Sequence, residues 1–134
     1  MKLFLVIAAL LSFACNKNKL HVSINNAPLI KIEEAGTGNV NQEIPITITY
    51  LLGSSSCTEF DRLEVNGNQP VTTAGTIYLR VYVKLTTGAN RACTDDLASR
   101  TVTFNFKAPL PGLYKLKAEL GYYNTIVEKD IIIQ

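Results

Sequence analysis

Three cysteines carry most of the reactive chemistry in this 134-residue chain: Cys15, Cys57 and Cys93. A thiol can form a disulfide or act as a nucleophile, and its neighbours decide which. Cys57 and Cys93 each flank a predicted strand, no CxxC spacing is present, and no His lies near either one. We therefore expect a structural Cys57–Cys93 disulfide that pins the loop at 86–99, with a redox or catalytic pair as the alternative.

Cys15 stands at the end of an N-terminal segment that is typical of a secretory signal. Lys2 supplies a positive charge, residues 3–14 form an apolar run of 12 residues, and the small residues Ser12 and Ala14 precede the cysteine. A run of this length is too short to cross a bilayer of about 30 Å at roughly 1.5 Å per residue. We expect residues 1–14 to be a signal peptide and the protein to be exported.

The stretch Leu11-Ser12-Phe13-Ala14-Cys15 resembles the lipobox of bacterial lipoproteins, although Ser12 stands where that family usually has leucine. The resemblance implies that Cys15 becomes the acylated mature N-terminus and binds a membrane, with residues 15–19 as the lipidated cysteine and a polar spacer. Ordinary signal peptidase cleavage, which would leave Cys15 as a free thiol, is the alternative. A Cys57–Cys93 pair would leave one odd cysteine in an oxidising compartment, which favours lipidation.

The spacer Asn16-Lys17-Asn18-Lys19 contains no acidic residue. In some Gram-negative groups, acidic residues directly after the lipidated cysteine mark lipoproteins for the cell surface. By that resemblance, we expect the protein on the periplasmic face of the envelope.

Catalytic and metal-binding patterns are weak. His21 is the single histidine, so neither a Ser–His pair elsewhere nor a zinc site can be assembled. Asp95 and Asp96 are adjacent in a loop and could bind Ca²⁺, but helix capping or solvation is the simpler interpretation. We expect a non-enzyme with no metal and no cofactor. The formal net charge of +2, without a run of basic residues, argues against nucleic acid as a partner.

Apolar and polar residues alternate with a period of two from Leu20 onward, which predicts β-strands with one face on a core. Turn-forming residues separate the runs. We expect about eight strands, near 20–24, 29–34, 43–51, 58–65, 76–85, 101–107, 113–121 and 125–133, and a single helical turn at 95–99. This number of strands predicts an all-β domain over residues 20–134, an antiparallel β-sandwich.

Two stretches resemble bacterial immunoglobulin-like and fibronectin type III-like domains, at 38–48 and at 104–116. The resemblance implies an immunoglobulin-like sandwich of seven or eight strands in which Tyr114 is the tyrosine-corner residue. The chain has no Trp, and Leu116 stands where a core cysteine would follow. An antibody-type disulfide is therefore not expected.

Two surfaces have the composition of binding sites. Tyr122, Tyr123 and Asn124 lie between the last two strands, and Tyr and Asn are typical of immunoglobulin binding loops. Tyr78, Arg80, Tyr82 and Lys84 alternate on one strand. The simpler interpretations are a turn whose tyrosines fold back onto the sheet and an ordinary exposed sheet face.

These observations favour a lipid-anchored binding or accessory module of the cell envelope, with an envelope protein or a glycan as partner. The alternative is a structural subunit that pairs through an open edge or through the C-terminal strand at 126–134.

Overall fold

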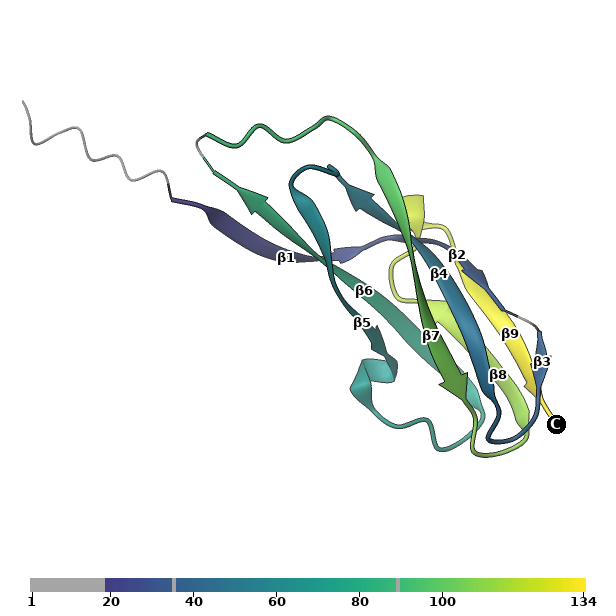
Figure 1. The fold of residues 1–134 in the computed structure, drawn as a ribbon. Coiled ribbons are helices and arrows are strands. Elements are labelled where there is room, and N and C mark those ends of the chain that lie inside the picture. Colours follow the sequence, from purple (N-terminus) through teal and green to yellow (C-terminus); the bar gives the residue numbers. More distant parts are fainter. Residues whose placement is uncertain (1–18, 35, 89) are drawn as a thin grey trace, which may run out of the picture.

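The computed structural model describes residues 19–34, 36–88 and 90–134, and they form nine β-strands in two sheets. The strands are β1 (His21–Ala27), β2 (Leu29–Glu33), β3 (Thr37–Gly38), β4 (Glu43–Gly53), β5 (Thr58–Val65), β6 (Gly75–Thr87), β7 (Ala98–Lys107), β8 (Gly112–Ala118) and β9 (Glu128–Ile133). The two sheets pack face to face (Figure 1), which confirms the predicted all-β sandwich. The predictions for residues 1–18, including Cys15, fall outside the described residues.

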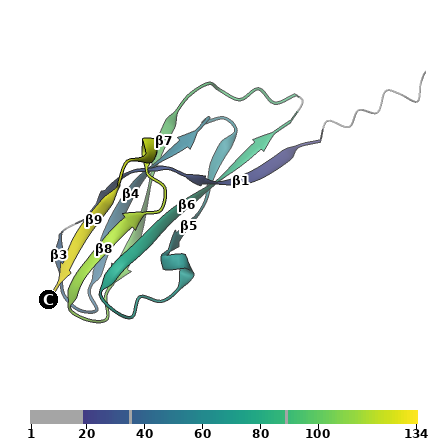
Figure 2. The ribbon, with the colours of Figure 1, turned by 180° about the vertical axis from the view of Figure 1, so that it is seen from behind.

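The larger sheet has six strands and is built around β6. Strand β5 pairs along one edge of β6, while β8 and β1 share the other edge, at Gly75–Leu79 and Val81–Thr87 respectively. Strands β9 and β3 continue the sheet beyond β8, and Figure 2 shows this sheet in front. The smaller sheet has the order β2-β4-β7. Most pairs are antiparallel, as expected, but β6–β8 and β3–β9 are parallel.

The core follows directly from the alternation of apolar residues. On β6 the side chains of Ile77, Leu79, Val81 and Val83 are buried against the smaller sheet, whose β4 contributes Ile44, Ile46, Ile48 and Tyr50. Burying one such aliphatic side chain contributes about 1.5–3 kcal/mol, so the two facing rows are a major source of stability.

Tyr114, at the start of β8, occupies the position that the resemblance assigned to a tyrosine corner. Its side chain is fully buried, and its hydroxyl donates a hydrogen bond of 2.8 Å to the carbonyl oxygen of Leu110. Its ring packs edge-on against Phe106, with 5.5 Å between the centroids. A tyrosine corner makes a contact of this kind between the tyrosine hydroxyl and the upstream backbone.

The structure differs from the local predictions in several places. Residues 95–99 form no helical turn, because Ala98 and Ser99 already belong to β7 and pair with the end of β4. The two-residue strand β3 is too short to leave an alternating pattern, so it was missed. The last strand begins at Glu128 rather than at residue 125, since a 3₁₀ turn, η3 (Tyr122–Asn124), and the following residues complete the connection from β8.

Candidate binding surfaces

The Cys57–Cys93 disulfide is formed, with 5.4 Å between the two Cα atoms, as the sequence predicted. Cys57 is buried directly before β5, whereas Cys93 is exposed in the loop between β6 and β7. The bond therefore ties a protruding loop to the end of the sandwich at which the described chain begins (Figure 1). This geometry fits the structural role of the pair.

A set of polar contacts reinforces the disulfide. The hydroxyl of Ser56 accepts a hydrogen bond of 2.8 Å from the Thr94 amide, and the Arg91 guanidinium donates one of 2.9 Å to the Ser56 carbonyl. The Asp96 carboxylate accepts a hydrogen bond of 3.0 Å from the Ser55 amide and another from the Thr94 hydroxyl. These bonds favour the ionised form and lower the pKa of Asp96 to about 2.

The Asp95–Asp96 pair therefore gains no support as a calcium site. The Asp96 carboxylate already receives hydrogen bonds from its own loop and from the β4–β5 turn. Within residues 19–34, 36–88 and 90–134, no three His, Cys, Asp or Glu side chains are grouped so that they could hold a metal ion.

The Asp96 contacts predict a pH-dependent contribution to stability. Because the pKa is lower in the folded state than its ordinary value of 3.8, the contribution is present above about pH 4 and is lost as the pH falls towards 2. Asp96→Asn should reduce the urea midpoint at pH 7 and leave it close to wild type at pH 2. Asp95→Asn is the matched control, and an equal deficit of Asp96→Asn at both pH values would contradict this assignment.

The Tyr122–Asn124 segment forms η3, a tight turn between β8 and β9. The Tyr123 side chain is 79% exposed, whereas Tyr122 is half-buried, and the two ring centroids are 4.1 Å apart. A hydrogen bond with the Tyr123 phenol raises the pKa of Tyr122. The Tyr123 ring therefore stands in solvent instead of folding back onto the sheet.

The backbone of this turn is unusual. Five residues other than glycine have a positive φ among the described residues: Asn41, Asn66, Asn68, Tyr123 and Asn124. Asparagine tolerates this left-handed region, but a bulky side chain such as tyrosine rarely occupies it. Tyr123, with φ 53° and ψ 35°, is thus held in a strained conformation at an exposed tip. Strain of this kind is concentrated at functional sites in proteins.

The Tyr78, Arg80, Tyr82 and Lys84 side chains share the outward face of β6, as predicted, but most of them already have partners. The Arg80 guanidinium pairs with Glu119 and donates a hydrogen bond of 2.6 Å to the Tyr82 hydroxyl. The Glu119 contact raises the pKa of Arg80. Arg62 lies 3.9 Å above the Tyr82 ring. Tyr78 is 49% exposed beside a shallow depression, which makes it the most available member of the row.

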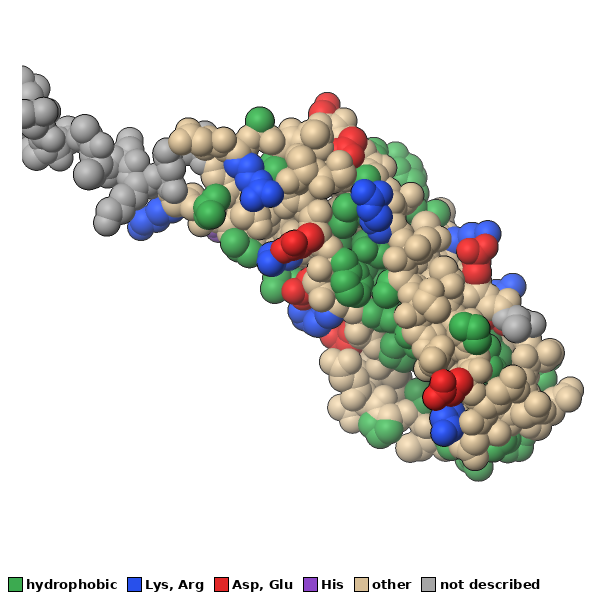
Figure 3. Space-filling view, viewed as in Figure 1, with side chains coloured by type: hydrophobic (Ala, Val, Ile, Leu, Met, Phe, Trp, Pro, Cys, Tyr) green, Lys and Arg blue, Asp and Glu red, His purple; other side chains and the backbone are tan. Residues whose placement is uncertain are grey.

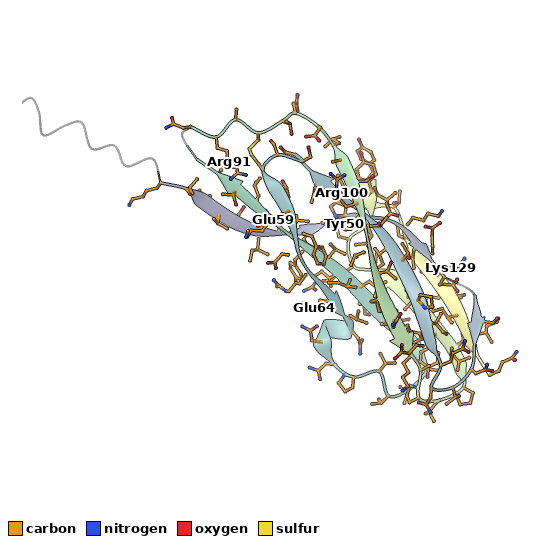
Figure 4. The ribbon with its side chains drawn as sticks, viewed as in Figure 1. Tyr50, Glu59, Glu64, Arg91, Arg100 and Lys129 are labelled. Carbon is orange, nitrogen blue, oxygen red and sulfur yellow. A yellow bond between two sulfur atoms is a disulfide. The ribbon has the colours of Figure 1, made fainter. Side chains whose placement is uncertain are left out.

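A groove that the sequence analysis missed lies between β5 and β7, the facing edges of the two sheets. Tyr50, Phe60 and Val102 contribute its apolar lining, and Arg100 and Glu59 lie at its rim (Figure 4). Burial raises the pKa of the Tyr50 phenol, although the Arg100 charge opposes the shift. Figure 3 shows hydrophobic side chains gathered along this opening.

One sequence signal could have revealed the groove. Arg100 pairs with Tyr50 and therefore lies on the inward face of β7, in the same row as Val102 and Phe104. A cation in an otherwise apolar row marks a place where the core opens to solvent. Among the described residues, no carboxylate lies within ion-pair distance of Arg100, whose guanidinium donates to the Ser99 carbonyl.

The apolar end of β9 is not a free edge. Strand β8 pairs along one side of it, and β3 pairs along the other at Ile132 and Ile133. In contrast, among the strands that the structure describes, β7 pairs only with β4, and β5 only with β6. Two of the open edges in the described sheets, those of β5 and β7, thus lie beside the groove.

Comparison with known proteins assigns the chain to no family. No family model, curated protein or solved structure matches the chain. None of the helices in the described part of the chain is long and apolar enough to cross a membrane.

Proposed function

We propose that this chain is a non-catalytic lipoprotein module of the bacterial cell envelope, anchored through Cys15 and facing the periplasm. The support for export and anchoring comes from the N-terminal sequence pattern, and the Cys57–Cys93 disulfide is compatible with an oxidising compartment. The Tyr114 contact supports an immunoglobulin-like or fibronectin type III-like relationship.

The module binds its partner, an envelope protein or a glycan, through Tyr122, Tyr123 and Asn124. The observation that carries this proposal is the strained, solvent-exposed Tyr123. Glycine or asparagine at this position would relieve the strain. The presence of tyrosine therefore supports a role of its side chain in binding. Two adjacent tyrosines also give a large contact area with little side-chain entropy to lose.

Photo-cross-linking in the producing bacterium tests the proposal. A photoreactive phenylalanine analogue placed at position 123 should form a specific adduct with an envelope component. The same analogue at position 68 is the matched control, since Asn68 also lies in an exposed turn with positive φ. The absence of a specific adduct at position 123, or equal adducts at both positions, would contradict the proposal.

Substitution of Tyr123 then separates binding from folding. Tyr123→Gly removes the strained side chain, so the free energy of unfolding should stay unchanged or rise by up to about 1 kcal/mol. Affinity for the cross-linked partner should fall at least about tenfold, as for a central aromatic contact. Asn68→Gly should change affinity by less than about twofold. Calorimetric titration and thermal unfolding give the two readouts.

A structural subunit is the second candidate, favoured by the open edges of β5 and β7. An exposed edge presents unpaired backbone groups to which another strand can be added. That role predicts oligomers of the mature chain in sedimentation, whereas the binding module is a monomer without its partner.

A further inference from the structure

We propose that the outward face of β1 rests on the lipid surface that holds the anchor, so that the domain lies against the membrane with this face down. The contact is made by the β1 stripe, which we define as Val22 and Ile24 of the strand together with Leu20 directly before it. This inference rests on the proposed anchoring of the chain at Cys15.

The β1 stripe is apolar, regular and uncovered. Leu20, Val22 and Ile24 are 67%, 53% and 51% exposed, and their alternate spacing places them on one face. Val22 and Ile24 pair with Thr86 and Lys84 of β6, which point away from the core. Figure 3 shows hydrophobic side chains on this side of the molecule, close to the point where the grey trace meets the described chain.

The length of the preceding chain keeps the stripe close to the anchor. Cys15 is four residues before Lys19, and four residues span at most about 14 Å when extended. Strand β1 has seven residues and is therefore roughly 23 Å long. An acylated Cys15 at the bilayer surface thus holds the stripe within reach of the headgroups at high effective concentration.

The charged residues near the anchor also favour a lipid surface as the partner of the β1 stripe. Lys17 and Lys19 lie between the anchor and the stripe, where lysine is attracted to anionic headgroups. Three partly exposed aliphatic side chains bind a membrane only marginally by themselves, so the anchor and the stripe act as two complementary signals. In the part of the chain that the structure describes, β1 pairs only with β6, so with its outward face on the headgroups the backbone groups of its free edge remain hydrated.

The chain offers a clean optical test, because it contains no Trp. The mature chain from Cys15 to Gln134 is prepared with Ile24→Trp or, as the matched control, with Asn25→Trp. Both positions are exposed, but they point to opposite faces of β1. With Cys57 and Cys93 oxidised, Cys15 is the single thiol, and it couples to a maleimide lipid. The vesicles contain phosphatidylethanolamine and phosphatidylglycerol with brominated acyl chains.

Brominated chains should quench the fluorescence of Ile24→Trp roughly threefold more than that of Asn25→Trp. Adding Leu20→Ser and Val22→Ser to Ile24→Trp should remove most of the difference. Equal quenching at positions 24 and 25, or none at either, would overturn the inference. A blue shift at position 24 that depends on protein concentration and not on vesicles would also overturn it, in favour of pairing between two copies.

The synthetic anchor makes the two possible failures distinguishable. Face-specific quenching without acylation of Cys15 in the bacterium would contradict the proposed anchoring and leave the membrane affinity of β1 intact. Acylation in the bacterium without face-specific quenching would contradict the inference alone.

Discussion

Replacing both Cys57 and Cys93 with alanine should lower the free energy of unfolding by about 4 kcal/mol. The bond joins positions 36 residues apart, and closing a loop of this length removes roughly 3.8 kcal/mol of chain entropy from the unfolded state. The melting temperature of a domain of this size should fall by roughly 15 °C. Chemical unfolding and a thermal melt of the double variant give both values.

Reduction of the wild-type protein is the first control and should reproduce the loss. Ser56→Ala is the second, because it removes the hydroxyl that accepts from Thr94 and keeps the disulfide. Its cost should be about 1 kcal/mol, as for a single exposed hydrogen bond. A loss below about 1 kcal/mol in the double-alanine variant would show that the polar contacts, and not the disulfide, hold the loop.

Gly121→Ala should cost about 2–3 kcal/mol of stability and disrupt the Tyr122–Asn124 turn, the second largest effect we expect. The φ of Gly121 is −89°, which any residue adopts, so conformational freedom is not the reason for glycine here. A Cβ at this position would lie 1.8 Å from the carbonyl oxygen of Thr125. The backbone must move by more than an ångström to accommodate it, which breaks the hydrogen bonds that close the turn at Tyr122 and Asn124.

Gly53→Ala is the matched control for this prediction. Gly53 has a φ of +87°, but nothing lies within 4 Å of its position for a Cβ. Gly53→Ala therefore measures only the free-energy cost of placing a residue with a Cβ in the left-handed backbone region, about 1 kcal/mol. Equal stability losses in thermal melts of the two variants would contradict the role assigned to the close approach at Gly121.

The sequence predicted the parts of this fold that depend on local periodicity. The alternation at 77–85 correctly identified the buried row of β6, because a strand with one face on a core repeats every two residues. The pairing of Cys57 with Cys93 was also predicted. Such features follow from the side chains themselves and can be predicted without knowing which strands pair.

Other features depend on contacts between distant segments and could not be predicted. The parallel pairing of β6 with β8 could not be read from the alternation of apolar and polar residues, since parallel and antiparallel strands both repeat every two residues. The positive φ of Tyr123 opposes its intrinsic preference and results from a turn closed by the Gly121–Thr125 approach. The groove between β5 and β7 exists only where the edges of two sheets meet, although the inward Arg100 marks its rim.

The most direct test of the central claim, a lipid-anchored and disulfide-bonded envelope module, is the intact mass of the full-length protein. It should be produced in a Gram-negative host and alkylated without reduction. We predict a mass that begins at Cys15, includes acyl chains and carries no alkylated thiol. An unacylated chain with Cys15 alkylated would contradict the anchor, and alkylation of Cys57 and Cys93 as well would contradict the disulfide.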